Sequence, residues 1–267
     1  MIERPDVTLL VNSSDGFEDC WAPFVHFLRH YWPACSYPVL LNTETKDWSS
    51  PDVELRTSRV GTGAAERLSW SDCLIRAIDQ VDTPLLLYFQ EDYFIEKPVR
   101  DDVISRAVQL MLEHPELGHI ALTRHGSFGP FAPSPYHGFS VIGQNARYRI
   151  STQAALWRPD VLRSYLDPRE NGWMFEILGT RRASKRPDLF FVADFDDAAG
   201  GPAIDYTHTG IIKGQWHEAM PTLFTRHGLG VDFARRGIYA EPPYWRRKWA
   251  VLRKLAEAPV HSIRHFF

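Results

Sequence analysis

Two adjacent carboxylates, Glu91 and Asp92, end an apolar run in the segment Pro84–Phe94, which reads PLLLYFQEDYF. The run Leu85–Phe89 has the length and composition of a strand that is buried on both faces of a sheet. The carboxyl ends of such strands are where open α/β sheets bind ligands, and Mg²⁺ or Mn²⁺ takes one or two carboxylates together with phosphate oxygens. We therefore predict a metal site at this pair; a solvated strand end is the alternative.

The elements before the acidic pair alternate between strands and helices. Apolar runs predict strands at Val7–Val11 and Val39–Leu41 and a weaker strand at Val53–Leu55, and the apolar spacing in Phe17–Tyr31 predicts a helix. An amphipathic helix over Leu68–Val81 leads into the acidic strand. A β-α-β start of this kind implies a parallel sheet whose strands are followed by loops at one edge.

Beyond the acidic pair the pattern is less regular. We expect three helices, over Asp101–His114, over Pro159–Leu166 and ending near Arg182. Strands are expected at His119–Thr123, Tyr148–Trp157 and Leu189–Val192. Residues 124–146 are predicted to form a long loop, and its many aromatic residues favour a binding loop over a disordered linker.

The composition narrows the class of protein. The 267 residues are 44% hydrophobic with a mean hydropathy of −0.29, and no segment approaches the roughly 20 apolar residues of a membrane span. Three cysteines without metal-binding spacing indicate reduced thiols and a cytoplasmic protein. Six of the 30 basic residues but only one of the 33 acidic residues lie from Tyr244 onward, so the remainder carries a net charge of −8. An acidic body argues against nucleic-acid binding.

The charge pattern also suggests the domain organisation. We predict a single catalytic domain over residues 1–243, with halves 1–98 and 99–243, and a basic amphipathic tail over 244–267. In the tail, Trp245 and Trp249 fall on one helical face and basic residues crowd the others, a pattern that suits the interface of an anionic membrane. The alternative is a helix that docks these tryptophans on the body.

The order of these features resembles the glycosyltransferases of the GT-A fold, the bacterial, family-2-like enzymes that use nucleotide-diphospho-sugars. In that family an Asp-x-Asp-like motif ends the strand that closes the nucleotide-binding half, and the matching residues are Gln90, Glu91 and Asp92, with Gln in the first position. The resemblance covers about residues 5–220. It implies an α/β, GT-A-like Rossmann-type sandwich with a central, mostly parallel sheet flanked by helices, and leaves the tail as a C-terminal basic helical appendage.

The resemblance also implies roles for single residues. Asp92, and after it Glu91, would bind a divalent cation (Mn²⁺ or Mg²⁺), and His208 would complete the metal site, with His217 as the runner-up. Glu176, at the end of NGWMFE, falls on the position of the general base of an inverting transfer. Its apolar neighbours suit that role, because they raise the pKa of a carboxylate.

The predicted substrate contacts lie on the loops after the strands and near the general base. The residues predicted to bind the donor nucleotide are Asn12, Ser13, Ser14, Asn42, Thr43, Arg67, Asp72 and Lys213. The residues predicted to contact the acceptor or the donor sugar are Gln153, Trp173 and Tyr136. Helix capping for Ser13 and Ser14, and a core position for Trp173, are the alternatives.

The predicted function is a hexosyltransferase-type enzyme, inverting and metal-assisted, that moves a sugar from a nucleotide-diphospho-sugar to a glycan or lipid-linked acceptor. The resemblance suggests cell-surface polysaccharide or lipopolysaccharide synthesis, in the cytoplasm or on the inner face of the membrane. A nucleotidyltransferase is one alternative, although NSSDGFED lacks the basic Gly-rich loop expected after the first strand. A non-catalytic carbohydrate-binding protein with a degenerate site is the other, and Gln90 is its main support.

Overall fold

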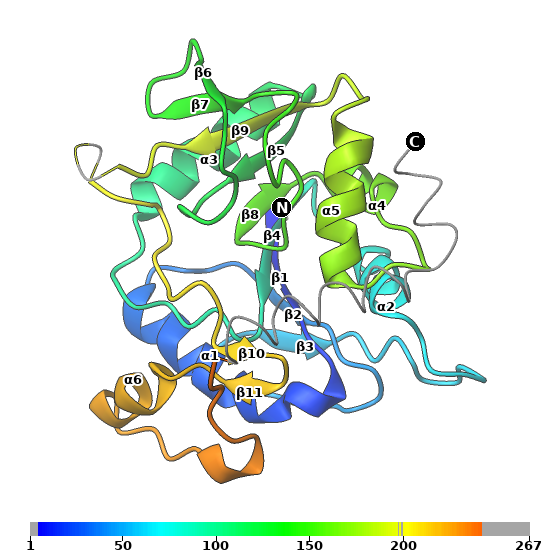
Figure 1. Ribbon diagram of the computed structural model, residues 1–267, viewed down its shortest axis with the longest axis vertical. Coiled ribbons are helices and arrows are strands. Elements are labelled where there is room, and N and C mark those ends of the chain that lie inside the picture. The colour runs from blue at the N-terminus through cyan, green and yellow to red at the C-terminus, as the bar shows by residue number, and fades with distance from the viewer. Residues whose placement is uncertain (1–4, 197, 199, 242–267) are drawn as a thin grey trace. The chain divides into compact units, whose positions relative to one another are not determined.

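The computed structural model describes residues 5–196, 198 and 200–241, and a nine-stranded mixed sheet dominates this part of the chain (Figure 1). Its strand order is β3-β2-β1-β4-β8-β5-β9-β7-β6. The chain divides into two compact units, Met1–Thr209 and Gly210–Phe267, and the large sheet belongs to the first.

The first half of the sheet is parallel. Its elements are β1 (Val7–Asn12), α1 (Glu18–Tyr31), β2 (Val39–Leu41), β3 (Leu55–Thr57), α2 (Trp70–Ile78) and β4 (Leu85–Gln90). The chain first builds outward from β1 through β2 to β3, and then returns to place β4 on the other side of β1. Because the strand order reverses between β1 and β4, their carboxyl ends lie at the topological position where open α/β sheets bind ligands.

The second half is mixed. Its elements are α3 (Asp101–Glu113), β5 (Leu117–Ala121), β6 (Phe131–Pro133), β7 (Phe139–Ile142), β8 (Ala155–Trp157), α4 (Pro159–Ser164), α5 (Gly172–Ala183) and β9 (Leu189–Ala193). β8 runs antiparallel to both of its neighbours, β4 and β5, whereas β5 and β9 are parallel. The residues just before β8 therefore lie at the same edge as the carboxyl ends of β4 and β5.

Helices cover both faces of the sheet, which explains why β4 is a continuous apolar run. Leu86 and Tyr88 face the side of α2, α4 and α5, and Phe89 meets Phe24 of α1 on the other side, with ring centroids 5.6 Å apart. Figure 1 shows α1 and α3 on one side of the sheet and α2, α4 and α5 on the other. Burying each such side chain contributes about 1.5–3 kcal/mol. The predicted α/β sandwich with a mostly parallel sheet is confirmed.

Two local predictions were wrong. Within the loop predicted over 124–146, β6 and β7 form a hairpin, because Phe139–Ile142 can pair with the exposed edge of β9. The strand predicted over 148–157 is reduced to its last three residues, since Tyr148 has a φ of +50° and the side chains of 151–153 turn to hydrogen bonds.

The second unit holds the short strands β10 (Ile211–Ile212) and β11 (Gln215–Trp216), followed by α6 (Met220–Arg226). The buried Trp216 packs on Phe224 and Phe233, with ring centroids 5.5 Å from each. The tail predicted over 244–267 lies outside the described residues. Within the described residues no helix is long and apolar enough to cross a membrane.

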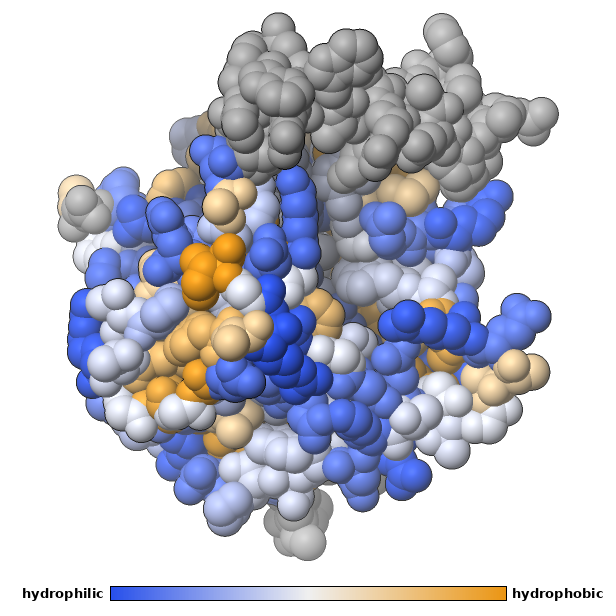
Figure 2. All heavy atoms as spheres, turned by 60° about the horizontal axis from the view of Figure 1, so that its bottom comes forward, coloured by the Kyte–Doolittle hydropathy of each residue, from blue (hydrophilic) through white to orange (hydrophobic). Residues whose placement is uncertain are grey.

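Few large apolar side chains are exposed in the part of the chain that the structure describes. Hydrophilic residues cover much of the face drawn in Figure 2, and the largest group of hydrophobic ones lies on its left side. Among the described residues the exposed large hydrophobic side chains are Leu112, Phe128, Phe131, Trp173 and Ile238. An exposed apolar side chain close to a polar site can indicate a binding surface.

One buried histidine makes the stability of the first unit depend on pH. His119 on β5 is fully buried between Trp157 and Phe190, and this burial, with the charge of Arg149, lowers the pKa of His119 to about 3. The unfolded chain takes up this proton below about pH 6.5, whereas the folded protein does not until about pH 3. The contribution of neutral His119 to the free energy of unfolding is therefore complete above pH 6.5 and is lost as the pH falls toward 3.

We expect the wild-type protein to lose about 2 kcal/mol of unfolding free energy between pH 7 and pH 5 relative to a His119→Phe variant. Urea unfolding of both proteins at the two pH values measures this difference. Parallel pH dependence of the two proteins would show that His119 titrates normally in the folded state.

Candidate active site

A buried layer of hydrogen-bonded polar side chains lines the carboxyl ends of the parallel strands. Asn12 Oδ1, at the end of β1, accepts a hydrogen bond from Asn42 Nδ2 at 2.8 Å, and the Ser58 hydroxyl donates to Asn42 Oδ1 at 2.8 Å. The backbone N–H of Thr43 donates to Ser58 Oγ at 3.0 Å. Asn12, Asn42 and Thr43, three residues predicted to bind the nucleotide, are thus brought together.

The loop after β1 is tied to the loop after β2. The Asp15 carboxylate accepts hydrogen bonds from the backbone N–H groups of residues 44–46 and from the Thr45 hydroxyl. Partial burial opposes ionisation of Asp15, but these hydrogen bonds together lower its pKa. Of the predicted serines, Ser13 accepts from Trp21 Nε1 at 2.8 Å, and Ser14 precedes the short turn Asp15–Phe17 without a capping hydrogen bond from its side chain.

A hollow of about 380 Å³ lies beside these loops and is lined in part by Asp15, Glu44, Gly61 and Arg67. Arg67 Nε lies 3.1 Å from Glu44 Oε1, and the Arg67 side chain is largely exposed. Asp72 lies in the first turn of α2, where it accepts from the Ser69 hydroxyl, and Ser69 in turn accepts from the Asp72 N–H as the helix cap. The structure therefore places Arg67 at the hollow and Asp72 in the capping arrangement of α2.

The acidic pair directly follows β4 and is buried, with Glu91 6% exposed and Asp92 5% exposed. The Thr209 hydroxyl donates to Asp92 Oδ2 at 2.5 Å. Asn12 and Gln90 are register partners on β1 and β4, so the pair emerges at the point where the strand order reverses. Two carboxylates removed from water at this point need polar partners or a cation.

A network of two tyrosines and one glutamine supports the acidic turn. The rings of Tyr93 and Tyr206 stack with their centroids 4.7 Å apart, and the Gln153 amide donates to the Tyr93 hydroxyl and accepts from the Tyr206 hydroxyl, both at 3.0 Å. Burial, and after it the charge of a neighbouring tyrosine and of Asp92, raises the pKa of Tyr93. Gln153, predicted to contact a sugar, is 6% exposed and belongs to this network.

Glu176 lies on α5 and reaches the same region. Its Oε1 accepts from the Thr152 backbone N–H at 2.8 Å and from the Thr152 hydroxyl at 2.9 Å. The Thr152 backbone oxygen accepts in turn from the Tyr93 hydroxyl at 3.1 Å. Thr152 therefore links Glu176 to Tyr93, the residue that follows the acidic pair.

The other predicted residues divide into those near this region and those elsewhere. Trp173 is 59% exposed, and it lies three residues before Glu176 and hence on the same helical face. His208 is exposed, with its ring centroid 5.1 Å from that of His125. Tyr136 instead packs on His114 after the end of α3, where its hydroxyl lies 2.9 Å from His114 Nε2.

Two predicted residues belong to the second unit. Lys213 lies at the turn between β10 and β11 with a φ of +52°, and its ammonium group lies 3.4 Å from the Tyr239 hydroxyl. His217 accepts from the Ala219 N–H through Nδ1 at 3.1 Å.

His125, which the sequence indicates only as a loop histidine without a metal, lies beside His208. Burial and the neighbouring His208 lower the pKa of His125. Its signal in the sequence, a histidine at the start of a long loop, does not differ from that of His137 on the same loop.

The two carboxylates at the acidic turn suit a cation that is bound partly by the protein and partly by a substrate. Within the described residues no group of three or more His, Cys, Asp or Glu side chains forms a metal cage. Magnesium-like ions, however, are commonly bound through one or two carboxylates plus substrate phosphates. Asp92 and Glu91 fit such a site, whereas a three-ligand site that includes His208 does not follow from the geometry.

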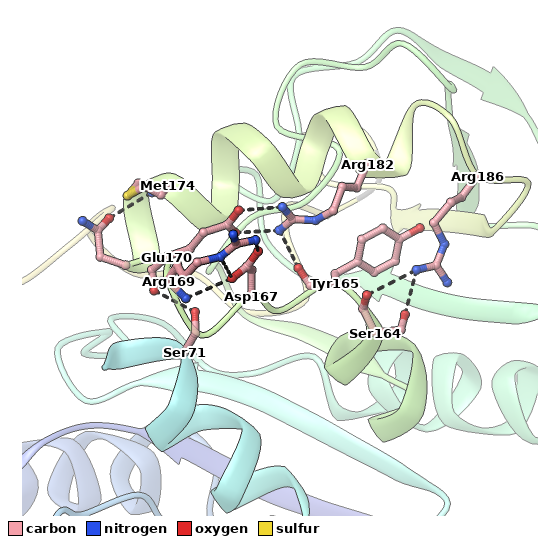
Figure 3. Close-up of polar contacts among 10 residues, drawn as sticks. Ser71, Ser164, Tyr165, Asp167, Arg169, Glu170, Met174, Arg182 and Arg186 are labelled. Atoms are coloured by element: carbon pink, nitrogen blue, oxygen red, sulfur yellow. Dashed lines mark hydrogen bonds and ion pairs between the residues drawn. The ribbon is translucent and has the colours of Figure 1, made fainter. Parts of the chain in front are cut away.

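The first turn of α5 is held by a buried ion pair (Figure 3). Glu170 is 1% exposed, and both of its carboxylate oxygens accept from Arg182 at 2.6 Å. The Ser71 hydroxyl of α2 donates to the Glu170 backbone oxygen at 2.8 Å, and Asn171 caps the helix through the Met174 N–H. These contacts fix the start of the helix that carries Trp173 and Glu176.

The comparisons with known proteins found no family model that matches the chain and no matching relative among curated proteins. Solved structures with a similar arrangement include S. aureus TarS 1–349, at 16% identity and a TM-score of 0.47, with 70% of this chain and 58% of that chain covered. A longer S. aureus TarS structure has 15% identity and a TM-score of 0.49, and the chain spans 36% of it. The chain therefore spans between about a third and three fifths of these two structures.

A third similar structure is glucosyl-3-phosphoglycerate synthase from Mycobacterium tuberculosis in complex with Mn²⁺ and uridine-diphosphate-glucose. It has 12% identity and a TM-score of 0.41, with 84% of this chain and 79% of that chain covered. These are structures to which the chain is similar. At such identities and TM-scores the similarity carries no argument about activity, which depends on the geometry of the chain itself.

We expect Arg182→Met to lower the free energy of unfolding by about 3–5 kcal/mol, because it leaves the Glu170 carboxylate buried and unpaired. The double variant Glu170→Gln/Arg182→Met should recover much of that loss. Urea unfolding followed by circular dichroism measures both.

The matched control is Arg169→Met, which breaks the exposed pair with Asp167 and should cost less than about 1 kcal/mol. An Arg182→Met cost no larger than that of the control would contradict a role for the pair in holding α5.

Proposed function

We propose that the chain is a glycosyltransferase that moves a sugar from a nucleotide-diphospho-sugar to a hydroxyl group of a glycan or lipid-linked acceptor. The observation that carries this proposal is the convergence of two features at one sheet edge. The buried acidic turn Glu91–Asp92 follows β4 at the strand-order reversal, and Glu176 of α5 binds Thr152, whose backbone oxygen accepts from the hydroxyl of Tyr93, the next residue after Asp92. The carboxylate pair can hold a cation that neutralises the leaving diphosphate, and the third carboxylate can act as the general base of an inverting transfer.

In the proposed donor site, the nucleotide lies over the carboxyl ends of β1 and β2. Asn12 and Asn42 form the polar floor there, and the hollow beside Arg67 is large enough for part of a nucleotide. Asp92, supported by the Thr209 hydroxyl, and Glu91 would hold a divalent cation. Such an ion, when bound, neutralises charge on the leaving diphosphate.

In the proposed acceptor site, Glu176 is the general base. The two hydrogen bonds from Thr152 fix the orientation of its carboxylate. Glu176 takes the proton of the acceptor hydroxyl, the acceptor oxygen forms a bond to the anomeric carbon of the donor sugar, and the bond to the nucleoside diphosphate breaks. The exposed Trp173 ring, one helical turn before Glu176, suits stacking on a sugar.

The biological setting is also part of the proposal. We infer a role in cell-surface polysaccharide or lipopolysaccharide synthesis, with the basic segment after Tyr244 attracted to an anionic membrane surface. The support for this step is the composition of that segment alone.

Asp92→Ala should weaken the binding of UDP or GDP in the presence of Mn²⁺ by at least about tenfold, because it removes the leading cation ligand. Calorimetric titration with each nucleotide, with and without Mn²⁺, measures the effect. Asp196→Ala is the control, since Asp196 is an exposed acid in a separate loop, and it should bind like the wild type. Failure of the wild-type protein to bind either nucleotide under any metal condition would rule out the proposed function.

Glu176→Gln should reduce transfer by about 10²–10⁴-fold while changing nucleotide affinity by less than about twofold, since the amide keeps the shape but cannot accept the proton. Turnover with nucleotide-sugar donors, measured beside the binding titration, separates the two effects. The control Glu113→Gln, an exposed acid on α3, should have no effect on either. Unchanged turnover in Glu176→Gln would remove Glu176 from the base position.

A further inference from the structure

Two aromatic rings, one exposed and one half-buried, lie on the loops around residues 128 and 148. Phe128 is 61% exposed, and its ring meets the ring of Tyr148 edge-on, with centroids 5.6 Å apart and planes at 67°. We call Phe128 and Tyr148 the aromatic ledge. Packing in the hydrophobic core does not explain this pair, because the Phe128 ring is exposed to solvent and the Tyr148 ring is only half-buried.

The backbone holds the ledge in place. The Phe128 N–H donates to the Arg147 carbonyl oxygen at 3.2 Å, and the Arg147 N–H donates to the Gly129 carbonyl oxygen at 3.1 Å. Tyr148 has a φ of +50°, in the left-handed region that costs a residue with a Cβ about 1 kcal/mol or more. Strain of this size persists where the surroundings enforce it, and it is concentrated at functional sites.

The arms of the ledge are linked to the proposed general base through Ser151 and Thr152. The Ser151 hydroxyl donates to the Gly126 carbonyl oxygen at 3.0 Å, which joins the arm of Phe128 to the arm of Tyr148. The next residue, Thr152, binds Glu176, and Ile150 exchanges hydrogen bonds with Thr180 one helical turn farther along α5. The ledge therefore stands on the segment that positions Glu176, beyond the carboxyl edge of the sheet.

We propose that the aromatic ledge is a second carbohydrate-binding subsite, which holds a sugar of the acceptor glycan next to the one that reacts. This step rests on the proposed function, since it assigns an acceptor to the same site. Rigid, partly exposed aromatic rings offer apolar area to the C–H faces of a sugar at a low cost in conformational entropy.

A protein partner fits the ledge less well. Stable protein interfaces bury more than about 1,000 Å². On the arm of Tyr148 the exposed side chains at Gln144, Asn145 and Arg147 are polar, and on the arm of Phe128 the exposed Phe131 ring packs on Phe195, with ring centroids 6.0 Å apart. Polar groups around a small aromatic surface instead suit the hydroxyls of a glycan.

The test is affinity electrophoresis of the full chain in native gels that contain dextran, galactomannan or hydroxyethylcellulose. The wild-type protein should be retarded by at least one of these polysaccharides. Phe128→Ala should weaken that retardation at least tenfold in apparent Kd. Tyr148→Gly should do the same, and because glycine adopts a positive φ without strain, this variant removes the ring and keeps the backbone.

Leu112→Ala is the matched control, because it removes an exposed apolar side chain of α3 and should migrate like the wild type. No retardation of the wild-type protein in any gel, or equal retardation of the ledge variants, would overturn the ledge as a subsite. The nucleotide titration is a separate readout. Nucleotide binding without glycan retardation would reject the ledge alone, whereas ledge-dependent retardation without nucleotide binding would reject the proposed function alone.

Discussion

Two carboxylates held away from water at the end of β4 impose the main constraint on this structure. Glu91 and Asp92 are each about 5% exposed, and burying charge is costly unless hydrogen bonds or a cation compensate. The Thr209 hydroxyl and the stacked pair Tyr93–Tyr206, joined through Gln153, surround this turn with polar groups from three separate parts of the chain. A sheet that needed only stability could end β4 with neutral residues, so the arrangement favours a role in binding.

The ion pair between Glu170 and Arg182 supports the helix that carries Glu176. Glu170 and Arg182 fix the start of α5, Ser71 joins that start to α2, and α5 in turn presents Glu176 to Thr152. The proposed donor side therefore rests on the parallel strands and the proposed acceptor side on one capped helix, joined by the loop before β8. The proposed ledge subsite stands on the same loop as Thr152, which binds Glu176.

The spacing of apolar residues and the switch to polar residues after β4 were sufficient to predict the mostly parallel sheet, the buried β4 and the position of Glu91 and Asp92 at its end. These features depend on local apolar runs and on the rules of α/β topology. They were insufficient for the β6–β7 hairpin, which depends on pairing with β9 some 50 residues away in the chain. The irregular segment before β8 was also missed, because its polar side chains bond to distant partners such as Glu176 and Tyr93. The contact of Tyr136 with His114 is of the same kind.

The most direct test of the central claim is a crystal structure of the protein with Mn²⁺ and a nucleoside diphosphate, with the metal located by its anomalous signal. The account predicts one metal peak within coordination distance of the Asp92 carboxylate and the diphosphate over the carboxyl ends of β1 and β4. A metal bound by the acids of the 194–196 loop, or a nucleotide in the hollow lined by Thr8, Pro38 and Thr83 at the amino ends of the strands, would contradict it.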